Sequence, residues 1–248
     1  MKILKIKYSG GCLEMNLGCE KAPDILLEKG WREASGKKFD EEEIKINKSN
    51  VDDVMENIEK SNGDIFLGGD HSITYGCFRG FAKKFSNAGI VIFDAHPDCY
   101  PEEFVNHENW VYWLIKEGVL KKENTIFIGL RAIDAKEKMF LDKNKIKYFT
   151  MEQLFNNEEN ICDAVMEMAR EFDGLYLSVD IDVLDPAFAP GTGYLEPGGM
   201  SSLELLYFLK RIRNLRNLKR VDLVEINPDK DINGVTVGAG QKILEIFV

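Results

Sequence analysis

The residues best suited to chemistry in this 248-residue chain are aspartates and histidines that follow short apolar runs. In the run 177–186, Asp180 and Asp182 interrupt residues that are otherwise apolar and strand-like. Alternate residues of a strand point to one face, so we expect both carboxylates to face one point near the end of a sheet. Unpaired buried carboxylates are costly, and metal coordination or protonation usually neutralises them.

Polar clusters of the same kind follow three other apolar runs. After Leu67, Phe93 and Val224 stand, in turn, Asp70 with His71, then Asp94, His96 and Asp98, and finally Glu225. In a doubly wound parallel sheet, ligand sites form at the carboxyl ends of the strands. We therefore expect these side chains to share one rim of the sheet.

The chain contains only three histidines, at positions 71, 96 and 107. A solitary histidine is more often a structural residue than a ligand. Here two of the three lie in the strand-end clusters and the third, His107, lies just downstream of one. Asp94, His96 and Asp98 alternate, so an extended segment would direct all three toward the same centre.

Six candidate ligands result, two imidazoles and four carboxylates: His71, Asp94, His96, Asp98, Asp180 and Asp182. This oxygen-rich set suits Mn²⁺ better than a thiolate-rich zinc site would. Six ligands exceed what one open metal site needs, whereas two ions about 3.5 to 4 Å apart would use them all and could ionise a bridging water. An Asp-x-Asp pair alone is also found in sugar-nucleotide transferases and phosphatases, and Asp185 fits equally well as the end of the strand.

A parallel sheet must position these residues. The pattern predicts strands at 1–8, 64–67, 90–93, 125–129, 146–149, 177–186 and 221–226. It predicts helices at 51–60, after Ser72 until Gly89, and at 110–117, 135–141, 158–172, from 201 and from 235, with a charged connection at 37–50. Such alternation is typical of an α/β fold with helices on both faces of the sheet. We expect one domain over residues 1–248.

Composition narrows the functional classes. A formal net charge of −10 and no basic stripe argue against a nucleic-acid or anionic-membrane partner. No apolar run approaches the roughly 20 residues of a membrane span, and no signal peptide is visible at the amino terminus. Five cysteines without paired spacing indicate reduced thiols, so we expect a cytoplasmic protein.

Four motifs, taken together, resemble the ureohydrolases, the family of arginase and agmatinase. They are Gly-Gly-Asp-His-Ser at 68–72, Asp-Ala-His-Pro-Asp at 94–98, the run from Ser-Val-Asp-Ile-Asp to Pro-Gly-Thr-Gly at 178–193, and Glu-Ile-Asn-Pro at 225–228. The resemblance covers most of the chain. It implies an arginase-type three-layer α/β/α fold with a mainly parallel eight-stranded sheet and a homo-oligomer, a trimer or hexamer.

The resemblance also implies two Mn²⁺ ions per subunit. One would be bound by His71, Asp94, Asp98 and Asp180, and the other by Asp94, His96, Asp180 and Asp182, so that Asp94 and Asp180 bridge. The reaction would be hydrolysis of a guanidino C–N bond to urea and an amine. Its catalytic residues would be Asp98, His107 and Glu225, with Glu225 holding the guanidinium and His107 delivering a proton to the leaving amine.

The substrate would be a small cationic guanidino compound that contacts His107, Tyr194 and Glu225. The loop from Asp98 to His107 is short and lacks the hydroxyl-rich run with which arginases read an amino-acid head group, which favours agmatine, cleaved to urea and putrescine in polyamine metabolism. Tyr194 stands where relatives carry a small hydroxyl residue. Arginase, guanidinobutyrase or formiminoglutamase activity, or a non-catalytic metal-binding role, therefore stay open.

Overall fold

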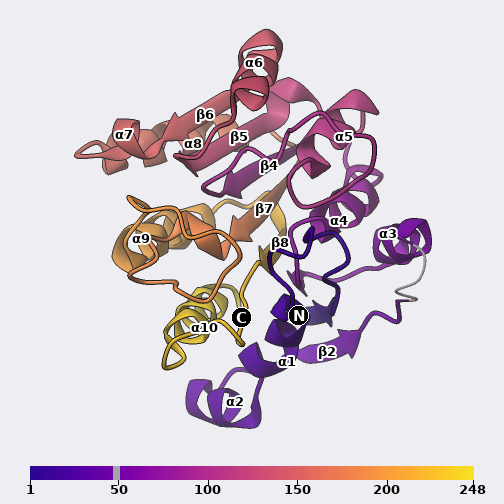
Figure 1. The fold of residues 1–248 in the computed structure, drawn as a ribbon, viewed down its shortest axis with the longest axis vertical. Helices are drawn as coiled ribbons and strands as arrows, with labels where there is room; N and C mark the ends of the chain where they lie inside the picture. The colour runs from indigo at the N-terminus through magenta and orange to yellow at the C-terminus, as the bar shows by residue number, and fades with distance from the viewer. Residues whose placement is uncertain (47–50) are drawn as a thin grey trace.

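The computed structural model describes residues 1–46 and 51–248, and the strands of this part form one sheet (Figure 1). The strands are β1 Lys2–Lys5, β2 Asp40–Glu43, β3 Ile65–Leu67, β4 Ala88–Phe93, β5 Thr125–Leu130, β6 Lys147–Thr150, β7 Gly174–Asp180 and β8 Leu218–Val224. Their order in the sheet is β2-β1-β3-β8-β7-β4-β5-β6. Every neighbouring pair of these described strands is parallel, which confirms the predicted eight-stranded parallel sheet.

Helices cover both faces of the sheet because alternate strand residues pack into two separate apolar cores. On β4, Val91 and Phe93 face one core, and Ile90 and Ile92 face the other. The first core is completed by α1 Ala22–Leu26, α2 Lys29–Ser35, α7 Met151–Leu154, α8 Glu158–Arg170, α9 Ser202–Ile212 and α10 Val235–Phe247. The second is completed by α3 Val51–Lys60, α4 Ile73–Ala82, α5 Trp110–Lys116 and α6 Ala135–Asn144. The predicted three-layer α/β/α class is confirmed.

Two sequence-based predictions about local structure were wrong. The charged connection predicted at 37–50 contains β2, whose four residues are exposed at the edge of the sheet and so lack apolar alternation; its last residues, 47–50, lie outside the described part of the chain. Gly89 does not end a helix, because α4 already ends at Ala82 and Gly89 lies within β4. A Cβ at Gly89 would lie 2.2 Å from the Phe172 ring, so close packing explains this glycine.

The strands that carry the candidate residues are neighbours in the middle of the sheet. β3, β8, β7 and β4 are consecutive in the strand order, and their carboxyl ends lead into His71, Glu225, Asp180 and Asp94. The topology therefore gathers residues that are far apart in the sequence. Among the described residues, no helix has the length and apolar character needed to cross a membrane.

Gly69 sits where three backbone segments meet beside this rim. The N–H of Asp70 donates to the carbonyl oxygen of Tyr8 at 3.0 Å, and the N–H of Glu225 donates to the carbonyl oxygen of Gly69 at 2.8 Å. A Cβ at position 69 would lie 1.8 Å from the oxygen of Tyr8. Only glycine permits this approach of backbone to backbone.

We therefore expect Gly69→Ala to lower the free energy of unfolding by about 3 kcal/mol, because the two strand ends must move apart. Gly30→Ala is the matched control, since a Cβ at this position in α2 meets no atom within 4 Å. It should raise stability by up to about 1 kcal/mol, the helix-propensity gain of alanine. Urea unfolding of both variants measures the difference, and equal stabilities would contradict the tight contact.

Candidate metal centre

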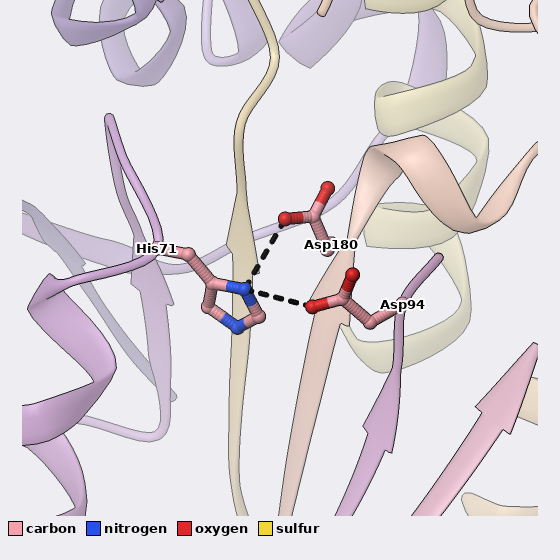
Figure 2. A group of neighbouring side chains, drawn as sticks. All are labelled: His71, Asp94 and Asp180. Atoms are coloured by element: carbon pink, nitrogen blue, oxygen red, sulfur yellow. Dashed lines mark ion pairs between the residues drawn. The ribbon is translucent and has the colours of Figure 1, made fainter. Parts of the chain in front are cut away.

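Three aspartates converge on one nitrogen of His71. The Nδ1 atom lies 2.9 Å from an oxygen of Asp98, 3.1 Å from one of Asp94 and 3.2 Å from one of Asp180. Figure 2 shows the Asp94 and Asp180 carboxylates arriving from two strand ends to face the His71 ring. All of these side chains are buried, so water does not screen their charges.

A second cluster lies beside the first and shares Asp94 with it. His96 Nδ1 lies 3.1 Å from Asp182 and 3.5 Å from the other oxygen of Asp94. In each group of three, His71 with Asp94 and Asp180, and Asp94 with His96 and Asp182, the potential ligand atoms lie within 4.8 Å of one another. Two metal-sized positions joined by one aspartate result.

The aspartates converge by a different route from the predicted one. β7 ends at Asp180, and Asp182 lies in the 3₁₀ turn η3, Ile181–Val183, whose first turn is capped by the Asp180 carboxylate accepting the N–H of Asp182 at 2.8 Å. The segment from Asp94 to Asp98 is likewise not extended, and Asp98 has a left-handed φ of 46°. The prediction that strand alternation directs these aspartates toward one point was therefore wrong. Aspartate side chains accept hydrogen bonds from nearby backbone N–H groups and so favour turns.

Asp98 differs from the other candidate ligands in having a hydrogen-bond donor on the oxygen that faces His71. Its Oδ2 faces His71, but the same oxygen also accepts a hydrogen bond from Trp110 Nε1 at 2.7 Å. Burial and the neighbouring Asp94 charge together raise the pKa of Asp98 to about 7. A nearby cation would favour the ionised form of this carboxylate at neutral pH. By contrast, burial would raise the pKa of Asp182, but His96 brings it down to about 2.

The opposite nitrogen of His71 is held by a buried hydroxyl relay. Ser178 Oγ lies 2.9 Å from His71 Nε2 and donates to Asp222 at 2.7 Å. Tyr176 and Thr74 also donate their hydroxyl protons to Asp222, each at 2.7 Å. An ionised carboxylate only accepts hydrogen bonds, so the Ser178 proton is directed to Asp222. The Ser178 oxygen must then accept the Nε2 proton of His71.

This relay directs the lone pair of His71 Nδ1 toward three carboxylates. Such an arrangement is unfavourable unless a cation lies between them. Nδ1 of His71 and Oδ2 of Asp94 are both buried, and neither has a partner in hydrogen-bonding geometry among the described residues. Burial would lower the pKa of His71, but the carboxylates of Asp180, Asp94 and Asp98 raise it well above its usual value. The position calls for positive charge, which a divalent metal ion would supply. The donor set thus fits a metal centre.

Glu225 and His107 form a second buried pair at the same rim. Glu225 has a left-handed φ of 64°, a strained conformation for a non-glycine residue. One of its carboxylate oxygens accepts the backbone N–H of His71 at 2.7 Å and lies 3.2 Å from His107 Nδ1; the other accepts the Asn16 amide at 2.6 Å. Burial would lower the pKa of His107, but Glu225 raises it to about 9. This raised pKa favours the imidazolium form of His107 at neutral pH.

A cavity of about 390 Å³ brings these groups together. His71, His96, Asp98, His107, Asp180, Asp182, Tyr194 and Glu225 line it, and Asp94 lies behind them. The cavity therefore collects every site residue predicted from the sequence except Asp94, which contacts two of its lining histidines. Asp185 is outside it and instead accepts the N–H groups of Ala187, Gly198 and Gly199, which fits the structural reading of this residue.

Sequence reasoning missed the residues that support the ligands. Ser178 and Asp222 are paired neighbours on β7 and β8, and each stands between two apolar residues of its strand, which was the available signal. A fully buried aspartate inside a strand indicates that neighbouring groups hydrogen-bond to its carboxylate. Asn16 and Trp110 gave no such signal, because they reach Glu225 and Asp98 from a loop and a helix whose positions only the fold determines.

Comparison with known proteins identifies the family. The arginase family model matches residues 11–248. An arginase of Staphylococcus aureus (strain COL) is 33% identical over 244 residues, covering 92% of this chain and 81% of the relative. An agmatinase of Photorhabdus laumondii is 35% identical over 180 residues, covering 71% of this chain and 56% of the relative.

The crystal structure of arginase from Bacillus subtilis superposes with a TM-score of 0.87 at 24% identity, covering 99% of this chain and 96% of the other. This match confirms that the three-layer fold is of the arginase type. Together with the family model and the curated relatives, it leads to one conclusion: the chain belongs to the arginase family of hydrolases.

Proposed function

We propose that this protein is a dinuclear manganese hydrolase that cleaves a guanidino C–N bond and acts on agmatine to release urea and putrescine. The observation that carries the proposal is that two buried atoms in a cluster of aspartates, Nδ1 of His71 and Oδ2 of Asp94, have no partner in hydrogen-bonding geometry among the described residues. A structural cluster would satisfy such atoms internally, whereas a metal site leaves them free for the ion.

The two ions would be held by the six residues named from the sequence, with Asp94 and Asp180 shared between them. Four carboxylates and two imidazoles make a hard donor set of the kind that suits Mn²⁺. When bound, two such ions lower the pKa of a water molecule so that it can act as a nucleophile at neutral pH. Ser178 and Asp222 would keep His71 in the tautomer whose Nδ1 can bind metal.

Glu225 and His107 would act on the substrate. The Glu225 oxygen bonded to Asn16 has capacity for one more donor, so it can accept a guanidinium N–H at the cavity wall. His107 carries a proton on Nε2, and this buried atom has no partner among the described residues. It can donate that proton to the departing amine nitrogen as the C–N bond breaks. Urea and an amine are then the products.

Electrostatics favour agmatine over arginine. The cavity is lined by eight carboxylates: Asp98, Glu108, Asp134, Glu137, Asp180, Asp182, Glu196 and Glu225. No lysine or arginine stands among the described residues that line it. The carboxylate of arginine would thus meet like charge, whereas agmatine carries none. Arginine, guanidinobutyrate and formiminoglutamate are the alternative substrates, and all three carry a carboxylate.

We expect the Mn²⁺-loaded protein to release urea from agmatine with kcat/KM at least about a hundredfold higher than from arginine, because like charges in a binding site cost several kcal/mol. A colorimetric urea assay with agmatine, arginine and guanidinobutyrate, and an assay of formamide release with formiminoglutamate, measure this. If none is hydrolysed while metal analysis finds both sites filled, the proposed activity is wrong. If arginine is preferred, the activity stands and the substrate assignment fails.

A second prediction concerns the relay behind His71. Ser178→Ala should weaken Mn²⁺ binding about 10- to 100-fold, the usual effect of losing a group that orients a ligand. Ser86→Ala is the matched control, since Ser86 also donates to an aspartate, Asp173, but at the surface. Its affinity for Mn²⁺ should equal that of the unmodified protein. Isothermal titration calorimetry measures both, and equal affinities for the two variants would exclude a positioning role for Ser178.

A further inference from the structure

Tyr194 is fixed across the cavity by three contacts. Its ring stacks on His107 with centroids 5.7 Å apart and planes 21° apart, and it lies 5.3 Å from the ring of His96. Its hydroxyl donates to Glu108 Oε1 at 2.6 Å. The phenol therefore cannot rotate away without breaking this hydrogen bond. The ring thus contacts His96 and His107, and its hydroxyl contacts Glu108.

Glu108 differs from the carboxylates at the reacting end of the cavity, because no cation pairs with it among the described residues. The four inner aspartates have His71 and His96, and Glu225 has His107. Within residues 1–46 and 51–248, no lysine or arginine nitrogen lies within ion-pairing distance of Glu108, and no group donates to its Oε2. One oxygen of Glu108 is thus available for a donor that the described chain does not provide.

The pair also lies at a different depth from the reacting end of the cavity. His107 and Glu225 are only 4% exposed, whereas Tyr194 and Glu108 are partly exposed. A guanidinium held at Glu225 would therefore leave the rest of its chain passing Tyr194 toward the cavity mouth. The Glu108 carboxylate would meet that far end.

We propose that Tyr194 and Glu108 determine substrate specificity by binding the distal ammonium group of a dicationic guanidino substrate. A carboxylate next to an aromatic ring is a favourable environment for an ammonium ion, because both groups attract positive charge. An uncharged end group gains neither attraction, and a carboxylate end is repelled. This inference rests on the proposed hydrolysis of guanidino compounds and assigns the residues that select among them.

Four substrates with the same four-carbon chain test the pair: agmatine, 4-guanidinobutanol, butylguanidine and 4-guanidinobutyrate. In the Mn²⁺-loaded protein, Glu108→Gln should lower kcat/KM for agmatine about tenfold, mainly through KM, as expected for losing a bond to a charged group. Turnover of butylguanidine and 4-guanidinobutanol should stay within about twofold. Tyr194→Phe keeps the ring but removes the hydrogen bond to Glu108. It should lower kcat/KM for agmatine alone, and by less than Glu108→Gln does.

Glu103→Gln is the matched control, because Glu103 lies in the same loop, is exposed and does not line the cavity. Thermal melting of all variants checks that they fold. A loss shared equally by all four substrates, or no loss for agmatine, would overturn the proposal. Calorimetric binding of agmatine and butylguanidine separates the two hypotheses: weaker agmatine binding by Glu108→Gln without any urea formation would support the pair and refute the hydrolase activity.

Discussion

Four aspartates buried at one rim of the sheet, with only two histidines facing them, are the constraint on which the rest of this structure depends. Concentrated negative charge away from water destabilises a fold unless cations neutralise it. The strand order brings the aspartates together, because β7 and β4, which lead into them, are adjacent and end at the same rim. Two divalent ions would offset the four charges and bind the buried atoms that have no hydrogen-bond partner among the described residues. The fold and the proposed chemistry thus share one electrostatic requirement.

The gathering of the site could be predicted from the sequence because it depends on topology alone. Apolar runs followed by aspartates and histidines indicate strand ends, and strand ends of a parallel sheet share a rim. Local geometry could not be predicted in this way: Asp182 lies in a 3₁₀ turn and Asp98 has a left-handed backbone, since aspartate carboxylates compete for backbone N–H groups. Supporting contacts such as Asn16 to Glu225 join residues more than 200 positions apart, and local patterns carry no information about them.

In the proposed function, substrate choice would depend on a different part of the cavity from metal binding. The relatives that match this chain include both arginases and an agmatinase, so family membership alone does not decide between their substrates. The residues that would hold the metal ions do not distinguish between substrates either, because every guanidino substrate would present the same group to them. We therefore propose that discrimination comes from the outer cavity, where Tyr194 contacts Glu108 and His107. Here the sequence predicted a departure at Tyr194, but the partnership with Glu108 needed the fold.

Anomalous X-ray diffraction at the manganese absorption edge, from crystals of the Mn²⁺-loaded protein, tests the central claim most directly. The account predicts two anomalous peaks per chain, one beside Nδ1 of His71 and one beside Nδ1 of His96, with Asp94 between them. The two ions should be about 3.5 to 4 Å apart, as in other two-metal hydrolytic sites. A single peak, or peaks remote from Asp94, would contradict a dinuclear centre and with it the proposed mechanism.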